Sequence, residues 1–357
     1  MYATSIGMEL TLVDIIGLIL LLLLMLGLGS SIDVVAFKNQ FRRPKKLLIG
    51  MFLQFVLQPP LAVIVGKAWG LPPVQAVSLV VTCSCPGGSM SNIICLLFRA
   101  DVDLSVAMTA ASSLAALFML PFNLYVYGGM VEGGEGMKMD FASVLLSCVV
   151  VITGTAGGYY VKSTNNEARV ILVAKVGFIS GLCIVAKSFF SNLTSDTPVY
   201  GADTNFITSC YTQILLTLGI GLSLSKVVFK LPGPSCMSIA TETSTQNAII
   251  ALSILTLSLN SDDSAAASII PIIYSSANTS TNILFGIFFW KVMGWSNVPK
   301  EATLKEMWKS YKELLAAENN GDGQRDYVER GNESGQLVRV APLVEVPDKD
   351  TLRADIA

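Results

Sequence analysis

A carboxylate inside an apolar stretch is the most chemically informative feature of this sequence. Glu242 lies in a run of seven consecutive polar residues, Thr241–Asn247, with apolar residues on both sides. A carboxylate near the middle of a membrane costs about 2.5–3.5 kcal/mol on insertion scales, so it should face the protein interior and have a partner. No Lys or Arg lies at comparable depth in any predicted membrane span. The sequence therefore predicts a bound cation as the partner, with protonation of Glu242 as the alternative.

A second unusual stretch interrupts another apolar segment. The string CPGGSMSN, residues 85–92, has apolar residues on both sides. Pro86 removes a backbone donor, and Gly87 and Gly88 remove the steric preference for helix. Irregular backbone is tolerated at membrane depth only where protein or a water-filled cavity satisfies its polar groups. The stretch therefore indicates a broken helix at a cavity or at a packed crossing.

Three further polar side chains lie in apolar segments. Ser105 and Thr109 have the i, i+4 spacing that places both on one helical face, directly after the short turn that follows CPGGSMSN. Gln54 carries both a donor and an acceptor in an otherwise apolar segment. Hydroxyls in membrane helices commonly bond to their own helix or to a neighbouring one, so this reading stays open beside a role as ligands.

The elements that must position these residues are apolar segments of about 20 residues, the length that crosses the hydrocarbon core as a helix. The third and eighth contain the two interruptions and are five crossings apart, so they run in opposite directions. Two interrupted helices in inverted halves indicate the binding site of a secondary transporter. The nine segments cover roughly residues 10–31, 47–67, 74–97, 104–127, 141–161, 170–190, 205–225, 236–258 and 265–290.

The distribution of charge predicts the topology. The first segment has Glu9 and Asp14 where a cleaved signal peptide would have basic residues, so we expect it to stay as an anchor with its amino end outside. Basic residues concentrate in the loops that this orientation places inside. An odd number of spans then puts the carboxyl end in the cytoplasm. The basic flank and the lack of a cleavable presequence favour the plasma membrane.

Three regions follow from these patterns. We expect residues 1–298 to form the transmembrane domain and residues 299–317 to form an amphipathic helix on the inner membrane surface. The segment 318–357 is rich in Gly, Asn, Asp and Glu, and we expect it to be disordered.

Composition supports an all-α polytopic membrane protein and excludes several functions. Of the 357 residues 52% are hydrophobic and 14% are charged, whereas soluble domains have about 25% charged residues. The chain has no His, which excludes His-based metal sites and Ser-His-Asp triads. A net charge of −2 with scattered basic residues argues against a nucleic-acid partner. We therefore expect membrane lipid around the chain, no catalytic residues and no enzyme activity; the sequence does not indicate an oligomeric state.

Four motifs occur in a fixed order along the chain: CPGGSMSN, DVDLSVAMT at 101–109, ETSTQN at 242–247 and IPIIYS at 270–275. Their sequences and spacing resemble the bile acid:sodium symporter family, solute carrier family 10, over roughly residues 11–295. The resemblance implies an inverted-repeat fold with a panel domain of spans 1, 5 and 6 and a core domain of spans 2–4 and 7–9. In the core, the two broken helices would cross near two sodium sites.

The resemblance also implies ligands for two coupling Na⁺ ions. The first site would consist of Ser91, Asn92, Ser105, Thr109 and Glu242. The second would consist of Gln54, Glu242 and Gln246, with the backbone carbonyls of Thr243 and Thr245. The substrate would lie near Pro86, Gly87, Gly88 and Asn247.

One position departs from the family pattern. Ser244 stands where the family usually has Gly after the Glu-Thr pair. If this residue needs a positive φ, the substitution strains the second site.

We therefore expect a sodium-coupled symporter of an organic anion, such as a bile acid, a sulfated steroid or a related carboxylate, that works by alternating access. Two alternatives remain. One keeps the fold but couples a small carboxylate to protons or to nothing, and then transport would ignore sodium. The other is a membrane receptor or scaffold without transport, which leaves the two midplane breaks and the buried acid unexplained.

Overall fold

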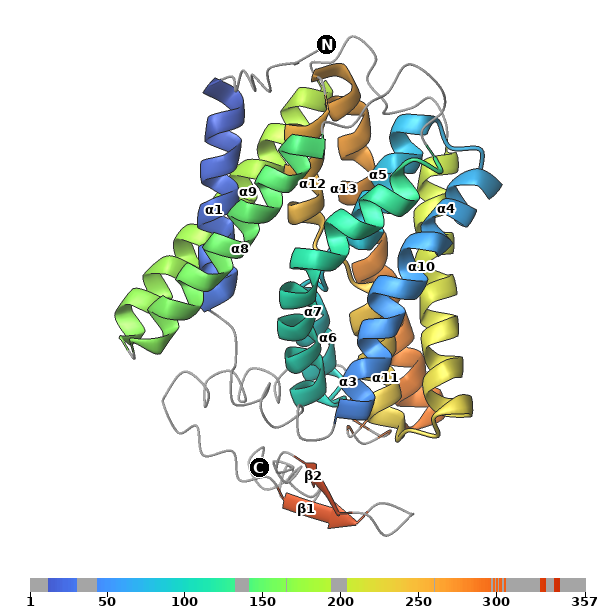
Figure 1. Cartoon of the computed structure of the whole chain (residues 1–357). Helices are drawn as coiled ribbons and strands as arrows, with labels where there is room; N and C mark the ends of the chain where they lie inside the picture. The colour runs from blue at the N-terminus through green and yellow to red at the C-terminus, as the bar shows by residue number, and fades with distance from the viewer. Residues whose placement is uncertain are drawn as a thin grey trace, which may run out of the picture.

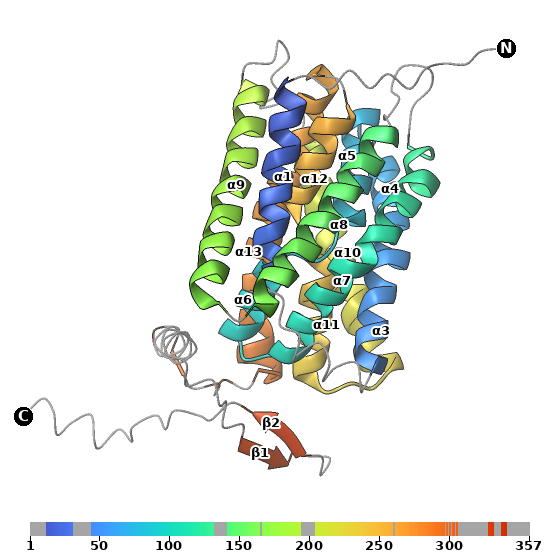
Figure 2. The same ribbon diagram turned by 60° about the vertical axis from the view of Figure 1, so that its left-hand side comes forward.

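Helices form nearly all of the regular structure in the computed structural model of the chain (Figures 1 and 2). The predicted helix over 299–317 falls largely outside the described residues and stays a prediction. The structure describes residues 12–30, 44–131, 141–164, 166–193, 204–259, 261–296, 298, 300, 302–303, 305, 328–331 and 337–340.

Each predicted apolar segment coincides with one helix or one pair of helices among these residues. Several helices end in a π-helical turn, labelled η. The unbroken segments correspond to α1 (Leu12–Ser30), α3 (Pro44–Phe52) with η1 (Leu53–Leu57) and α4 (Gln58–Ala68), α7 (Val102–Asn123) with η2 (Leu124–Gly128), α8 (Phe141–Ser163), α9 (Glu167–Leu193), α10 (Asn205–Ser223) with η3 (Leu224–Val228), and α13 (Ser261–Phe288) with η4 (Phe289–Met293).

The two predicted interruptions are confirmed. The third segment is divided into α5 (Pro73–Ser84) and α6 (Met90–Leu97), and the eighth into α11 (Gly233–Ser244) and α12 (Ala248–Ser258). The linkers between these paired helices contain the residues singled out above.

Polarity is distributed as in an integral membrane protein, with apolar side chains outside and polar ones inside. Phe118 is 77% exposed and Val227 is 71% exposed, whereas Glu242 is 1% exposed. In the described part of the chain, four segments are long and apolar enough to cross a membrane: Pro44–Ala68, Val102–Gly128, Glu167–Lys187 and Asn205–Val228. Shorter apolar helices, among them α5 and α12, accompany these four segments.

Glycines bring α1, α8 and α9 into backbone contact, and these helices lie together in both views (Figures 1 and 2). A Cβ atom on Gly27 of α1 would lie 2.8 Å from the Cα of Gly177 of α9. A Cβ on Gly154 of α8 would lie 2.6 Å from the Cβ of Met25 of α1. Small residues at helix contacts allow close packing in membranes, where hydrophobicity does not separate helix from lipid. These helices therefore form a tightly packed layer beside the helix breaks.

Two short strands lie within 318–357, and the expectation that this segment is otherwise disordered stays a prediction. β1 (Val328–Gly331) pairs antiparallel with β2 (Leu337–Val340), and Val328 lies opposite Val340. β-branched residues favour extended backbone, but a run of four residues is too short to outweigh the polar composition around it in a sequence-based prediction.

The glycine contacts predict a selective effect on stability. Gly27→Val should lower the unfolding free energy by about 1–3 kcal/mol, because the added side chain meets the α9 backbone. Gly219→Ala in α10 is the matched control, since a Cβ there has no atom within 4 Å, and it should leave stability unchanged or raise it slightly. Thermal unfolding of the detergent-purified variants measures both. Equal losses in the two variants would contradict the assigned contact.

Candidate cation site

The two helix breaks satisfy each other's backbone groups. The backbone N–H of Gly88 donates to the carbonyl of Thr245 at 3.2 Å, and that of Asn247 donates to the carbonyl of Pro86 at 3.0 Å. The two linkers form an antiparallel bridge. Polar backbone freed by each interruption is thus paired inside the protein, as an apolar surrounding requires.

The carboxylate of Glu242 lies at this crossing, near the end of α11. Its Oε1 accepts a hydrogen bond from Thr109 Oγ1 at 2.5 Å, and its Oε2 accepts one from Ser105 Oγ at 2.9 Å. A Cβ atom on Gly87 would lie 2.5 Å from Oε1, so only glycine allows the first break to approach the acid this closely. Residues from three predicted segments therefore meet at one carboxylate.

The group around Glu242 contains more acceptors than hydrogens. Asn92 Oδ1 accepts from the hydroxyls of Ser105 at 2.8 Å and Thr109 at 3.3 Å, which also face the carboxylate. A hydroxyl can donate only one hydrogen. The hydroxyls of Ser91, Ser105 and Thr109 therefore supply three hydrogens to five oxygens, namely the two carboxylate oxygens, Asn92 Oδ1 and the carbonyls of Gly88 and Ser105. In the described part of the chain, no Lys or Arg forms an ion pair with Glu242. An oxygen-rich group with one negative charge suits a hard monovalent cation.

A second group of oxygens lies where η1 meets the crossing. Gln54 Nε2 donates to the carbonyl of Cys85 at 2.8 Å and to Gln246 Oε1 at 2.7 Å. Gln246 Nε2 donates to the carbonyl of Thr243 at 3.0 Å. Gln54 Oε1 is buried without a hydrogen-bond partner among the described residues. A buried oxygen without a partner is costly unless a ligand satisfies it, so this group has room for one more donor or for a cation.

The π-helical turn η1 carries Gln54 toward the crossing. Pro59 has no N–H to donate to the carbonyl of Phe55 four residues earlier. That carbonyl accepts instead from Asn123 Nδ2 of α7 at 3.1 Å. Such single π turns are frequent at functional sites.

The remaining predicted ligands differ in whether the side chain or the backbone faces the crossing. Ser91 Oγ donates to the carbonyl of Gly88 at 2.7 Å and also contacts the Glu242 carboxylate. Thr245 Oγ1 is turned away, toward Asn278 Oδ1 at 3.0 Å. The hydroxyl of Thr243 bonds back within α11, so Thr243 and Thr245 face the crossing through their backbone.

Ser244 fits its position without strain. It lies in α11, and the non-glycine residues with positive φ in the described ranges are Arg99 and Lys230. Its carbonyl accepts from Tyr274 Oη at 3.0 Å and from Asn278 Nδ2 at 2.8 Å. The departure from the family pattern therefore does not distort this backbone.

A row of polar residues on α13, which was not predicted from the sequence, supports the second break. Tyr274, Asn278 and Asn282 have i, i+4 spacing, and each bonds to Ser244. Their shared spacing on a long apolar helix is a signal that could have identified them.

A cavity of about 80 Å³ lies between the crossing and helices α1 and α8. Gly87 and Asn247, two of the residues predicted near the substrate, line it. Pro86 and Gly88 are not in this lining and instead pair with the second break.

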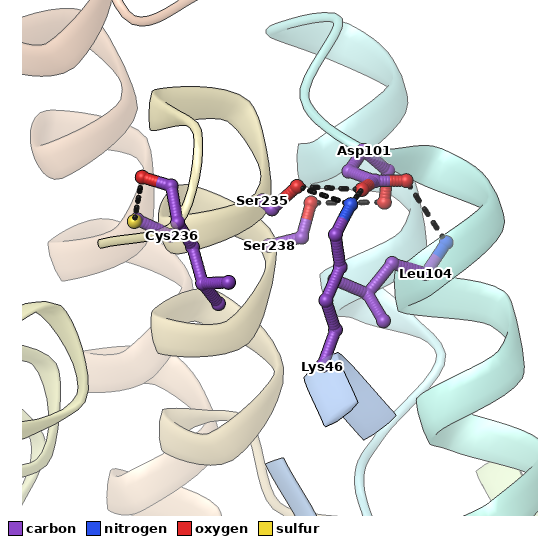
Figure 3. Close-up of polar contacts among 7 residues, drawn as sticks. Lys46, Asp101, Leu104, Ser235, Cys236 and Ser238 are labelled. Atoms are coloured by element: carbon purple, nitrogen blue, oxygen red, sulfur yellow. Dashed lines mark hydrogen bonds and ion pairs between the residues drawn. The ribbon is translucent and has the colours of Figure 1, made fainter. Parts of the chain in front are cut away.

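A polar cluster at one end of α7 fixes the helix that carries the two hydroxyls (Figure 3). Asp101 caps this helix, because its Oδ1 accepts from the N–H of Leu104 at 3.3 Å. Its Oδ2 accepts from Lys46 Nζ at 3.0 Å and from Ser235 Oγ at 2.7 Å. Ser238 Oγ donates to the Asp101 carbonyl at 2.9 Å. The starts of α3, α7 and α11 are therefore tied together, which sets the depth of α7 relative to Glu242.

The chain is similar in sequence to one known family and to several characterised transporters. The model of the Sodium Bile acid symporter family matches residues 18–195. An ileal sodium/bile acid cotransporter of Cricetulus griseus is 30% identical over 72% of this chain and 73% of its own length. A hepatic sodium/bile acid cotransporter of Homo sapiens is 27% identical over 78% and 80%. A sodium-dependent organic anion transporter of Bos taurus is 28% identical over 70% and 65%.

The cluster at Asp101 predicts an order of stabilities. Asp101→Ala removes the helix cap and the Lys46 contact together and should lower the unfolding free energy by about 1–2 kcal/mol. Asp101→Asn keeps an oxygen for the cap and should lose less, since a partly exposed ion pair contributes little. Lys46→Met serves as the control that keeps the helix cap, since it removes the ion pair and the hydrogen bond from Lys46 Nζ to Ser235 Oγ at 2.8 Å. Thermal unfolding of the purified variants gives the order, and an Asn variant as unstable as the Ala variant would contradict it.

Proposed function

The chain belongs to the Sodium Bile acid symporter family, and on this premise we propose that it is a sodium-coupled symporter of organic anions that works by alternating access. The observation that carries the proposal is the shortage of hydrogens around the buried Glu242, at the contact between two broken helices. Sodium would supply the missing positive charge.

The first sodium site would use the group around the carboxylate. Sodium would replace the hydrogen bonds that now join these oxygens, and each hydroxyl could then turn its hydrogen elsewhere. Thr109 can do so at no cost in packing, since its Oγ1 also lies 3.1 Å from the carbonyl of Ser105 in its own helix. The ligands would be Ser91, Asn92, Ser105, Thr109 and Glu242.

The second sodium site would use the group at η1. In the structure the amide hydrogens of Gln54 and Gln246 occupy the space between its oxygens. Rotation of the Gln54 amide would bring its orphaned Oε1 to the cation. Glu242 would contribute to both sites and compensate part of their charge. The ligands would be Gln54, Glu242 and Gln246 with the carbonyls of Thr243 and Thr245.

The fold supports a division into two moving parts. We assign the nine segments to nine membrane spans, with the amino end outside, the carboxyl end in the cytoplasm and the protein in the plasma membrane. Helices α1, α8 and α9 would form the panel and the remaining helices the core. Because the glycine contacts hold the panel helices together, the panel can move as one body against the core. The cavity of about 80 Å³ at their boundary would widen as the two parts separate and would then receive the substrate.

The lining of this cavity bears on how an anion would be held. Its polar members carry hydroxyl and amide groups, and no Lys or Arg is among the residues that line it. The negative charge of a substrate would therefore be balanced by co-bound sodium and by the amino ends of α6 and α12, which begin at the breaks. Bile acids, sulfated steroids and related carboxylates fit this class.

Two sodium ions supply the driving force and make transport of a monoanion electrogenic. A charge that crosses a potential of 100 mV contributes about 2.3 kcal/mol, so two sodium ions contribute about 4.6 kcal/mol. A co-transported monoanion offsets one of these charges, and one net positive charge enters per cycle.

Replacement of sodium by choline tests the coupling directly. Uptake of a labelled bile acid or steroid sulfate into expressing cells should fall to background without sodium. Glu242→Gln should abolish the sodium-dependent part, because it removes the charge while keeping the shape. Ser78→Ala, which removes a buried hydrogen bond to Ala267 away from the site, should retain sodium dependence. Uptake that ignores sodium and rises at acid pH would instead establish proton coupling.

The close approach of Gly87 to the carboxylate predicts a second loss of transport. Gly87→Ala places a methyl group where Glu242 Oε1 lies, so the acid must move away from its hydroxyl partners. Sodium-dependent uptake should fall by at least about 10-fold, equivalent to about 1.4 kcal/mol, at equal surface expression. Gly128→Ala has no atom within 4 Å of the added Cβ and should transport normally. Normal uptake by Gly87→Ala would show that transport does not require the close approach of Gly87 to the Glu242 carboxylate.

A further inference from the structure

The carbonyl of Thr243 is left without a backbone donor at the end of α11. In a continuous helix it would accept from the N–H of Asn247, but that N–H donates to the carbonyl of Pro86 at 3.0 Å. Carbonyls in the last turn of a helix need other partners. Two side-chain amides supply them: Gln246 Nε2 at 3.0 Å and Gln58 Nε2 at 2.6 Å.

These two donors differ in their relation to the proposed second sodium site. Gln246 belongs to the site itself. Gln58 lies at the start of α4, is 0% exposed and does not belong to either predicted ligand set. A carbonyl oxygen has two lone pairs. Gln58 occupies one lone pair of the Thr243 carbonyl oxygen, and Gln246 occupies the other. Sodium would take the place of the Gln246 amide hydrogen at this second lone pair.

The orientation of Gln58 is fixed by α10. Its Oε1 accepts from Gln213 Nε2 at 2.6 Å and from Thr217 Oγ1 at 3.0 Å. Because the oxygen edge of the amide is held by two donors, its nitrogen edge must point the opposite way, toward Thr243. Rotation of the amide would break three buried hydrogen bonds at once, and each unsatisfied group would carry its full desolvation cost.

We propose that Gln58, held by Gln213 and Thr217, is a positioning residue for the second sodium site: it aims the Thr243 carbonyl at the ion without contacting the ion. This inference rests on the proposed sodium-coupled function. Ligand oxygens need to be held within a fraction of an ångström by residues around them. Removal of the Gln58 amide should therefore weaken sodium binding while the ligands themselves remain.

The test is the dependence of uptake on sodium concentration. Gln58→Met keeps the length of the side chain and removes the amide. It should raise the sodium concentration for half-maximal uptake by about 2- to 10-fold, the effect of one net hydrogen bond. The maximal rate at saturating sodium should stay within about twofold of the wild type, because the ligands are intact.

Variants of α10 provide a graded series and a rescue. Thr217→Val removes one of the two bonds to Gln58 Oε1 and should give a smaller rise in half-saturation. Thr217→Ser restores the hydroxyl and should return half-saturation to the wild-type value. If Gln58→Met does not fold, the two Thr217 variants provide the test. An equal sodium concentration for half-maximal uptake in Thr217→Val and Thr217→Ser overturns the proposal.

A control separates positioning from general stability. Ser78→Ala removes a buried bond of the same length, 2.6 Å, between α5 and α13, and neither Ser78 nor Ala267 belongs to a predicted ligand set. It should lower thermal stability without a change in half-saturation. A Gln58→Met variant that loses stability but keeps wild-type half-saturation overturns the inference.

Gln54→Ala separates failure of this inference from failure of the second site. If Gln54→Ala raises half-saturation and Gln58→Met does not, the positioning role is wrong and the second site stands. If neither variant alters sodium dependence, the second site is wrong, and the positioning role falls with it.

Discussion

Two interrupted helices meet at one buried carboxylate, and the rest of the structure depends on this contact. Each break frees backbone groups that the other break satisfies, so neither interruption is stable alone in an apolar surrounding. Glu242 adds a charge that the described side chains do not neutralise. Nearby sequence features follow from this arrangement: Gly87 leaves space for the acid, and Ser105 and Thr109 meet it from α7.

Supports around the crossing come from helices on several sides. α13 holds the end of α11 through Tyr274 and Asn278, and α10 holds Gln58. The cluster at Asp101 ties the starts of three helices. These contacts lie within the proposed core, whereas glycines bring α1, α8 and α9 into close contact. In the proposed rocking of panel against core, such supports would keep the ligand geometry while the boundary opens.

Local patterns predicted the helices and the breaks, because length, hydropathy and the residues Pro and Gly act over short distances. The pair Ser105 and Thr109 followed from i, i+4 spacing. Contacts between distant segments were not predictable in this way: Gln58 and Gln213 are 155 residues apart, and no local spacing links them. The family pattern left open whether position 244 needs a positive φ, and the backbone of Ser244 is helical. The strands near the carboxyl end were missed because four residues carry too weak an alternation.

The central claim is that this oxygen-rich crossing binds sodium through Glu242. Equilibrium binding of radioactive sodium to the purified protein, without substrate or membrane potential, measures this most directly. The account predicts saturable binding to the wild type, displaced by unlabelled sodium but not by choline, and loss of that binding in a folded Glu242→Gln variant. Wild-type affinity in the folded variant, or no saturable binding to the wild type, would contradict it.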